Sequence, residues 1–391
     1  MSVDKAYGTM RTLFLRPNPN TNVKTHAVLD VTNSVDFPAE LAHCAAAVPG
    51  GKLVDAHAEA IAISQILLLA RGFEFCLIDS DGDSDQAVIE TARCLRRRFP
   101  EMMLGLSGMK PKDFPENLFH KVYPHLFDGT LFADLGVEDS FCSRSAVDIY
   151  RRDLNIENYH RPHLRHPYLV LMGKRGRLRR SVREIASDVE RVLTEFPRVQ
   201  EIFFDDESLT ADPQRAEEIS TVFKTARIAW SGRSKPHAEK KTLTLLRDAG
   251  LRLLDVDYAP VEESGFPETS RSATQFTSDC LSLGIRIHGR FVLGLPGETR
   301  KSIRDKIRFV CDLDVDTIHV DMQSPQNGSE LDQEDLLRGL FRMYARFYLR
   351  PKKIWRTVKA AWQRPSQRKR RFQIGRRFLR LLWKGPESLI G

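Results

Sequence analysis

The chain has 391 residues, of which 41% are hydrophobic and 29% charged, a composition typical of a folded protein with room for two domains. Its apolar runs are shorter than the ~20 residues that cross a bilayer, and residues 1–10 are too short and polar for a secretory signal. The net charge is +8, but residues 350–391 hold fourteen Lys or Arg and one Glu, which leaves −5 for the first 349 residues. We therefore expect a cytoplasmic protein whose basicity belongs to a C-terminal tail.

Six cysteines are spread along the chain, at positions 44, 76, 94, 142, 280 and 311. No two are close enough to form a CxxC or CxxxCxxC ligand pattern. Cys76 and Cys311 lie in the apolar contexts FCLI and FVCDL, where a free buried thiol is the expected state. The pattern favours a reducing compartment over a disulfide framework.

Short apolar segments alternate with helix-like segments between residues 10 and 135, which predicts βαβ units around a parallel sheet and a Rossmann-like domain. The predicted strands are 12–16, 52–55, 73–78 and 102–106, and the predicted helices are 39–47, 56–69 and 86–98. After the second strand, Asp55-Ala-His57-Ala-Glu-Ala60 nearly matches the D-x-H-x-x-G signature whose histidine binds the cobalt of cobalamin, but Ala replaces the final Gly. We interpret His57 as a surface histidine and keep cobalt ligation as the alternative.

Residues 136–166 are loop-rich and predict a linker between two domains. The linker ends in Asn158-Tyr-His-Arg-Pro-His-Leu-Arg-His166, whose three histidines are compatible with a metal site. No carboxylate or cysteine is placed to complete the ligand set, so an exposed linker is the favoured interpretation.

A second alternation between residues 167 and 335 predicts six strand–helix units, which is a partial barrel. The predicted strands are 168–172, 201–204, 227–230, 253–258, 285–293 and 317–320, and the helices are 182–193, 213–225, 239–249, 274–283 and 302–311. Active sites of such folds lie at the carboxyl ends of the strands. The candidates there are Asp205, Asp206 and Glu207 after the second strand, Arg233 and Lys235 after the third, and Gly294, Leu295, Pro296 and Gly297 after the fifth.

This last turn belongs to the stretch 284–305, GIRIHGRFVLGLPGETRKSIRD. An apolar run predicts a strand, GLPG breaks it, and Ile303, Ile307 and Val310 at helical spacing predict a helix that begins near Glu298. A strand, a tight turn and a helix N-terminus form the place where α/β proteins bind anionic or nucleotide-like ligands. A turn without a ligand is the alternative.

Five motifs occur in this order: IFFDDESLT, WSGRSK, TLTLLRDAGLRLL, GIRIHGRFVLGLPGETRKSI and DTIHVDMQSPQNGSEL. The chain resembles, over nearly its whole length, the cobalamin-binding-domain class of radical S-adenosylmethionine (SAM) enzymes, and within it the hopanoid-biosynthesis-associated branch. The resemblance implies a cobalamin-binding-type Rossmann domain at 10–135, a linker at 136–166, a partial (βα)6 barrel at 167–335 and a basic helical tail at 336–391. It also implies a [4Fe-4S] cluster that cleaves SAM to start radical chemistry.

The resemblance assigns roles to the candidate residues. Asp205 and Asp206 would meet the SAM amino group, and Gly294, Leu295, Pro296 and Gly297 would pack near its adenine. For the two aspartates, a helix cap and solvent-facing acids are the alternative. Lys235 takes the place of a family arginine, so it keeps the charge but loses the planar fork that suits a carboxylate. The family's Glu-Ser-Gly aligns with residues 259–261, and the nearby Glu-Ser-Gly at 263–265 is displaced by four.

One family feature is missing. The CxxxCxxC loop that holds the cluster follows the first barrel strand, and this chain reads HPYLVLMGKRGRLRRSV there, at 166–182. The loop is too short to wrap a cubane, and it offers only cationic donors, which do not ligate iron: Lys174, Arg175, Arg177, Arg179 and Arg180. Cys142 is the first candidate for a substitute ligand. We therefore expect the cluster to be absent and regard SAM as a possible ligand. Cobalamin binding stays open, since the family also binds cobalamin without a lower histidine ligand.

The tail from Tyr348 to Lys384 interleaves fourteen cations with three of the four tryptophans. Basic helices with aromatic residues lie in membrane interfaces, so we expect residues 350–384 to bind an anionic membrane surface. Nucleic-acid binding is the rival, and a solvated basic helix is the alternative without a partner.

The sequence thus predicts a radical-SAM-like α/β protein without a functional cluster, which acts as an accessory or ligand-binding paralogue. We expect it to be peripheral to the inner membrane face and associated with hopanoid or lipid modification. Hopanoid-modifying enzymes are candidate partners. The alternative is an active cobalamin-type radical SAM enzyme that modifies a hopanoid or related lipid side chain. A third reading is that the basic loop 174–180 fills the cluster position and binds a phosphate-bearing ligand.

Overall fold

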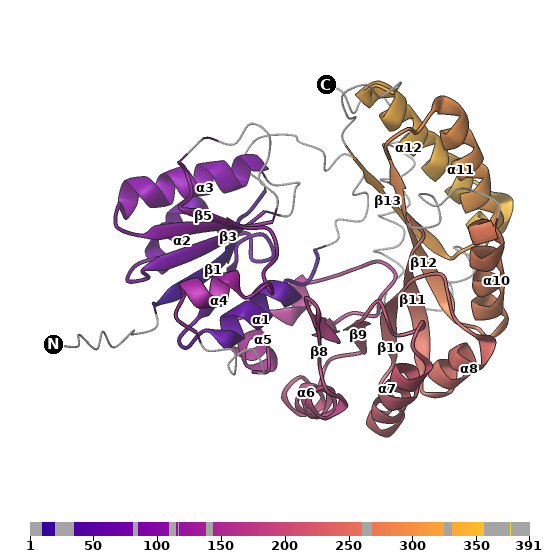
Figure 1. Ribbon diagram of the computed structural model, residues 1–391, viewed down its shortest axis with the longest axis horizontal. Coiled ribbons are helices and arrows are strands. Elements are labelled where there is room, and N and C mark those ends of the chain that lie inside the picture. The colour runs from indigo at the N-terminus through magenta and orange to yellow at the C-terminus, as the bar shows by residue number, and fades with distance from the viewer. Residues whose placement is uncertain are drawn as a thin grey trace. The chain divides into compact units, whose positions relative to one another are not determined.

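The computed structural model describes residues 10–19, 35–80, 85–108, 115, 117–137, 144–259, 268–323, 331–355 and 376. The chain divides into two compact units, residues 1–205 and 206–391 (Figure 1), which are described one at a time. The predicted domain boundaries at 135, 166 and 335 stay predictions. Among the described residues, no helix has the length and apolarity needed to cross a membrane.

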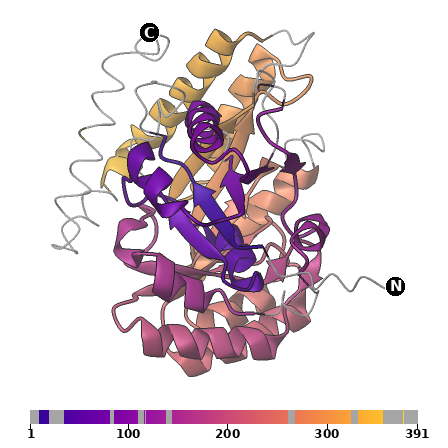
Figure 2. The same cartoon turned by 90° about the vertical axis from the view of Figure 1, so that its left-hand side faces the viewer.

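Unit 1 contains a five-stranded parallel sheet (indigo and purple in Figures 1 and 2). Its strands are β1 (Thr12–Arg16), β2 (Lys52–Asp55), β3 (Phe75–Asp79), β4 (Met103–Ser107) and β5 (Lys121–Tyr123), and its helices are α1 (Ala39–Ala47), α2 (Ile63–Leu69), α3 (Asp85–Arg98), α4 (Thr130–Asp134) and α5 (Val147–Asp153). The strand order is β2-β1-β3-β4-β5, one of the two common doubly wound orders. The predicted Rossmann-like fold is therefore confirmed.

The core of this sheet follows from its sequence. Every residue of β1 is buried, as are Phe75–Ile78 in β3, because central strands of a parallel sheet are covered on both faces and read as continuous apolar runs. The predicted helix over 56–69 is wrong in its first half. The Asp55 carboxylate accepts a hydrogen bond from the Ala58 N–H at 2.9 Å, and Ala60 adopts a left-handed φ of 53°, so residues 56–60 form turns and α2 begins only at Ile63.

A second parallel sheet has six strands in the order β13-β12-β11-β10-β9-β6. Unit 1 holds β6 (Tyr168–Met172), α6 (Val182–Glu195) and β9 (Glu201–Asp205); unit 2 holds α7 (Pro213–Ala226), β10 (Trp230–Ser234), α8 (Lys240–Asp248), β11 (Leu251–Asp257), α10 (Glu268–Ser282), β12 (Arg286–Leu293), α11 (Arg300–Asp312), β13 (Thr317–Met322) and α12 (Gln333–Tyr348). These βα units confirm the predicted α/β class with an open barrel-like sheet.

One predicted strand is displaced. The sequence predicts a strand at 227–230, but Arg227 has a left-handed φ of 54° and ends α7, and the strand β10 runs from Trp230 to Ser234. Arg233 therefore lies within the strand, and Lys235 is the first residue after it.

The strands of unit 2 have an apolar face that packs against helices; Figure 1 shows α8, α10 and α11 along one side of them. Trp230 stacks on Phe223 of α7, with ring centroids 4.3 Å apart, and its indole N–H donates to the Ala249 carbonyl at 2.9 Å. Phe291 stacks on Tyr258 with centroids 5.1 Å apart. The opposite face has a different composition, described below.

The turn after β2 provides a test of the fold. A non-glycine residue in the left-handed region is destabilised by roughly 1–2 kcal/mol. Replacing it with glycine removes this strain, but glycine loses more conformational entropy on folding, which offsets part of the gain. We expect Ala60→Gly to raise the free energy of unfolding by up to about 1 kcal/mol. Ala58→Gly, two residues away at an ordinary φ, should lower it by roughly 0.5–1 kcal/mol. Urea unfolding of both variants makes the comparison, and equal destabilisation would contradict the turn geometry.

Candidate binding site at the carboxyl ends of the strands

Asp205 and Asp206 follow one another at the end of β9 but have different surroundings. Asp205 is half-buried, and its carbonyl accepts a hydrogen bond from Gly173 N–H at 2.9 Å. Asp206 is buried: its Oδ1 accepts from the Ser208 N–H at 3.0 Å and from the Ser208 hydroxyl at 2.6 Å, and its Oδ2 lies 3.4 Å from Arg215 Nε. Asp206 thus stabilises its own turn. The alternative of a solvent-facing acid is wrong for this residue.

The turn after β9 is connected to the end of β10. The hydroxyls of Thr210 and Ser234 are hydrogen-bonded at 2.6 Å, and Ser234 Oγ donates to the Lys235 carbonyl at 2.6 Å. Arg233 Nη1 lies 4.0 Å from Glu207 Oε1, and the side chains of Glu207 and Lys235 are exposed. Two cations and a carboxylate therefore gather at this strand end in unit 2.

The GLPG turn after β12 is held by a network that the sequence did not reveal. Gly294 has a φ of 90°, its N–H donates to Glu298 Oε2 at 2.6 Å, and a Cβ there would collide with the Gln323 carbonyl. Glu298 Oε1 lies 2.7 Å from Lys306 Nζ, which donates to the Val292 carbonyl at 2.6 Å. Both charged side chains are buried.

The rest of the turn is accessible. Leu295 is half-buried, whereas Pro296 and Gly297 are exposed, and Gly297 has a φ of 76° with open space where a side chain would stand. Lys306 lies among the apolar positions of α11, and only its distance of eight residues from Glu298 hints at the pair. The fixed turn thus leaves Pro296 and Gly297 accessible from outside.

The face of β10–β13 opposite the helices is polar. Register places Arg233 beside Asp255, Asp255 beside His288 and His288 beside Thr317; one pleat further along, Asp257 lies beside Arg290 and Arg290 beside His319. We call these residues, together with Asp321, the polar strand face. Its members are Arg233, Asp255, Asp257, His288, Arg290, Thr317, His319 and Asp321. The alternation in RIHGRFVL and TIHVDM was a signal for it in the sequence.

Contacts within the polar strand face order its side chains. His288 Nδ1 and Thr317 Oγ1 are 2.7 Å apart. Asp321 bonds to His319 at 2.9 Å and to Arg290 at 3.4 Å. Partial burial raises the pKa of Asp321, but the hydrogen bond and charge of His319 and the charge of Arg290 outweigh burial and hold this pKa below its ordinary value. Alternating cations and carboxylates on one surface suit a small zwitterionic ligand.

The connection after β6 is a tight hairpin of β7 (Lys174–Arg175) and β8 (Leu178–Arg179). Arg175 is buried and donates to His43 Nδ1 at 3.3 Å and to the Arg144 carbonyl at 2.9 Å. Arg180 is buried and donates to the Met172 carbonyl at 3.1 Å and to Asp188 at 2.6 Å. These guanidinium groups do not ligate iron, so the residues after β6 do not fit a [4Fe-4S] cluster.

The described ranges contain no candidate metal centre. No three or more His, Cys, Asp or Glu side chains are arranged there to hold a metal ion. The five described cysteines are free, and Cys44, Cys76 and Cys280 are buried. Cys142, the displaced Glu-Ser-Gly at 263–265 and most of the tail, 356–375 and 377–391, lie outside the described residues.

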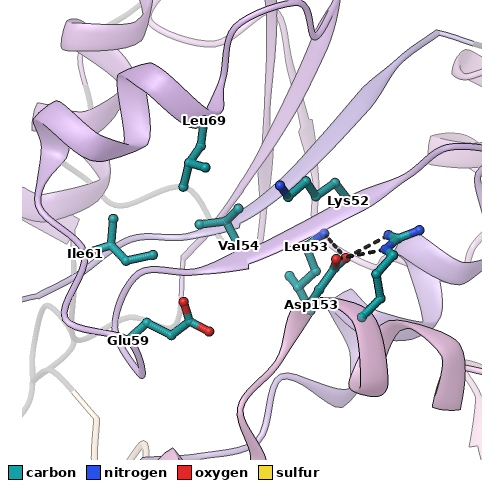
Figure 3. A pocket seen from close by; sticks show the side chains of 8 residues that line it. Lys52, Leu53, Val54, Glu59, Ile61, Leu69 and Asp153 are labelled. Carbon is teal, nitrogen blue, oxygen red and sulfur yellow. Dashed lines mark hydrogen bonds and ion pairs between the residues drawn. The ribbon is translucent and has the colours of Figure 1, made fainter.

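At the end of β2, Asp55 is engaged internally. Its Oδ2 accepts from the Tyr159 hydroxyl at 3.0 Å and lies 3.6 Å from Arg16. His57 is half-buried in the following turn. Beside this turn a cavity of about 470 Å³ is lined by residues that include Val54, Glu59, Ile61, Leu69 and Asp153 (Figure 3). Burial, then Asp55 and Asp153, raises the pKa of Glu59. The cavity has the size of a small-molecule site.

Comparisons with known proteins agree with this fold. No family model matches the chain. An uncharacterized methyltransferase, PH0819 of Pyrococcus horikoshii, is 25% identical over 160 residues, which are 37% of this chain and 34% of that protein. The match therefore spans about a third of the relative's length.

Among solved structures, the radical SAM methyltransferase TsrM from Kitasatospora setae, with tryptophan and a SAM analogue bound, has a TM-score of 0.51 at 12% identity, covering 80% of this chain and 73% of TsrM. A second TsrM structure, with cobalamin and a [4Fe-4S] cluster, has a TM-score of 0.48 at 12% identity, covering 80% and 75%. The chain thus has a fold like that of a radical SAM methyltransferase.

The hairpin makes a prediction about pH. Burial, followed by the charges of Arg175 and Arg180, holds the pKa of His43 well below its ordinary value. Below about pH 6.5 the His43 side chain therefore binds a proton in the unfolded chain but not in the folded chain, so stability falls as the pH decreases. Between about pH 7 and pH 5.5 this group should lower the free energy of unfolding of the wild type by about 1 kcal/mol, and we expect His43→Gln to abolish that decrease.

Urea unfolding across this pH range measures the effect. His125→Gln is the matched control, because it also replaces one histidine of unit 1 but at an exposed position. A His43→Gln variant that follows the wild-type slope would show that His43 takes up its proton equally in the folded and the unfolded chain, which would contradict the lowered pKa.

Proposed function

We propose that this chain is a radical-SAM-like protein that binds SAM, or a related nucleotide-like ligand, without holding a [4Fe-4S] cluster. The observation that carries the proposal is the hairpin after β6, where two buried arginines stand in the place expected for thiolates. An iron–sulfur cluster needs thiolate ligands and an open site for the substrate. On this proposal the chain is an accessory or ligand-binding paralogue.

The strand ends in unit 2 support a ligand of this kind. Lys235 and Arg233 are cations at the end of β10, suited to the carboxylate of SAM. Glu207 is exposed beside Arg233 and is available for the ammonium group. The exposed Pro296 and Gly297 leave room for a flat ring over the turn. Asp206, already bound by Ser208 and Arg215, contributes to the site by fixing the turn.

We further propose association with an anionic membrane surface and with hopanoid or related lipid modification, in which hopanoid-modifying enzymes would be partners. The support is the sequence resemblance and the basic tail at 350–384. Three cations of this segment are used internally: Arg350 bonds to the Cys311 carbonyl, Lys352 to Asp314 at 2.7 Å, and Lys353 to the Val315 carbonyl. Residues 350–353 are thus anchored on the fold, and the exposed Ile354 and Trp355 follow them.

The second candidate is an active cobalamin-type radical SAM enzyme that modifies a hopanoid or related lipid side chain. The similarity of the fold to TsrM and the 160-residue match to a methyltransferase favour it. This candidate needs thiolates from outside 167–181, with Cys142 first.

SAM binding to iron-free protein tests the proposal. Isothermal titration of SAM into protein prepared with a chelator should show saturable binding at a one-to-one ratio. Lys235→Gln should weaken binding about tenfold, because it removes one charge-assisted contact. Lys241→Gln, an exposed lysine in α8, should bind SAM like the wild type. Binding that occurs only after iron and sulfide are supplied would overturn the proposal.

A further inference from the structure

The helices α11 and α12 of unit 2 lie side by side and enclose a groove of about 210 Å³. Its walls carry four arginines, Arg300 and Arg304 from α11 and Arg338 and Arg342 from α12. Its floor is formed by Ile303, Ile307 and Gly339, and Asp335 completes the lining. The helices approach closely because Gly339 has no side chain: a Cβ there would stand 3.1 Å from Ile303 Cγ2.

The four arginines differ in their partners. Arg300 makes a bidentate pair with Asp335, at 3.0 and 2.8 Å. Arg338 bonds to Glu334 at 2.5 Å. Arg304 and Arg342 are exposed, and among the described residues neither forms a hydrogen bond or ion pair. Two guanidinium groups from neighbouring helices therefore line the groove without a partner among the described residues, whereas the Asp335 carboxylate in the same groove is engaged by Arg300.

We propose that this groove binds the phosphate of an anionic phospholipid headgroup. Arginine is the residue best suited to phosphate, since its planar fork donates two parallel hydrogen bonds. The isoleucine floor offers an apolar contact to the first carbons beyond the phosphate. The proposal deepens the membrane association proposed above, which located binding in residues 350–384, by adding a defined site on the folded surface.

The surroundings of the groove favour a lipid over a nucleic acid. The chain continues from α12 into residues 349–355, where Leu349, Ile354 and Trp355 are exposed to 46%, 48% and 70%. Exposed aliphatic and tryptophan side chains next to cations are typical of a membrane interface. A nucleic acid would instead need a long track of cations for its backbone, together with aromatic platforms for its bases. The groove is short and holds no aromatic residue.

Flotation of the full-length protein with vesicles is the test. The wild type should bind vesicles of phosphatidylcholine with phosphatidylglycerol and not vesicles of phosphatidylcholine alone. Arg304→Gln with Arg342→Gln should weaken binding about thirtyfold, since each cation near an anionic surface contributes roughly 1 kcal/mol. The matched control is Arg97→Gln with Arg198→Gln, which removes two exposed charges from unit 1 and should change binding less than threefold.

Each other outcome overturns the inference. If both double variants weaken binding equally, net charge alone is responsible. If the groove variant binds like the wild type, the tail is sufficient and the membrane proposal stands without the groove. If the wild type does not bind anionic vesicles, both the membrane proposal and the groove proposal are wrong. Binding of an oligonucleotide that depends on Arg304 and Arg342 would then assign the groove to nucleic acid. Competition by inorganic phosphate at concentrations that leave vesicles intact would show that the groove takes free phosphate instead of a lipid. Circular dichroism and thermal unfolding verify that both variants fold.

Discussion

The buried pair of Arg180 and Asp188 fixes the point where the first strand of the six-stranded sheet passes into its helix. The two side chains are 2% and 3% exposed and 2.6 Å apart, and Arg180 also holds the Met172 carbonyl at the end of β6. Burying a guanidinium group costs several kcal/mol unless it is paired, and losing either partner leaves a buried charge. The pair therefore stabilises the connection between β6 and α6 in a single, short conformation.

Arg175 performs the same task on the other arm of the hairpin, where it meets His43 of α1 and the Arg144 carbonyl. The imidazole accepts this bond only while it is neutral, which agrees with the lowered pKa of His43. A connection packed in this way is part of the core of unit 1. A cofactor that needs three thiolates and an open coordination position finds neither there.

The chemistry-bearing groups of unit 2 are instead spread over the strand ends and the polar strand face. Strands of parallel sheets are usually apolar on both faces, yet β11, β12 and β13 alternate apolar and charged residues. Such charges stay ionised only with compensating partners, and His319 and Arg290 supply them for Asp321.

Much of the fold could be predicted from the sequence because apolar periodicity marks buried strands and helices directly. Ile303, Ile307 and Val310 were predicted as one helix face and are buried. The errors came from single residues that override periodicity: Ala60 and Arg227 adopt left-handed conformations that shorten one helix and displace one strand. The site was less predictable. The buried Glu298–Lys306 pair joins residues eight positions apart, and the partners of Asp206 depend on packing, which a linear sequence does not display.

The central claim is that this fold holds no iron–sulfur cluster. The most direct measurement is the iron and sulfide content of the full-length protein after anaerobic reconstitution, together with its visible absorption spectrum. The account predicts no bound iron or sulfide above the level of a similarly treated protein without cysteine ligands. About four irons and four sulfides per chain, with reductive cleavage of SAM, would contradict it.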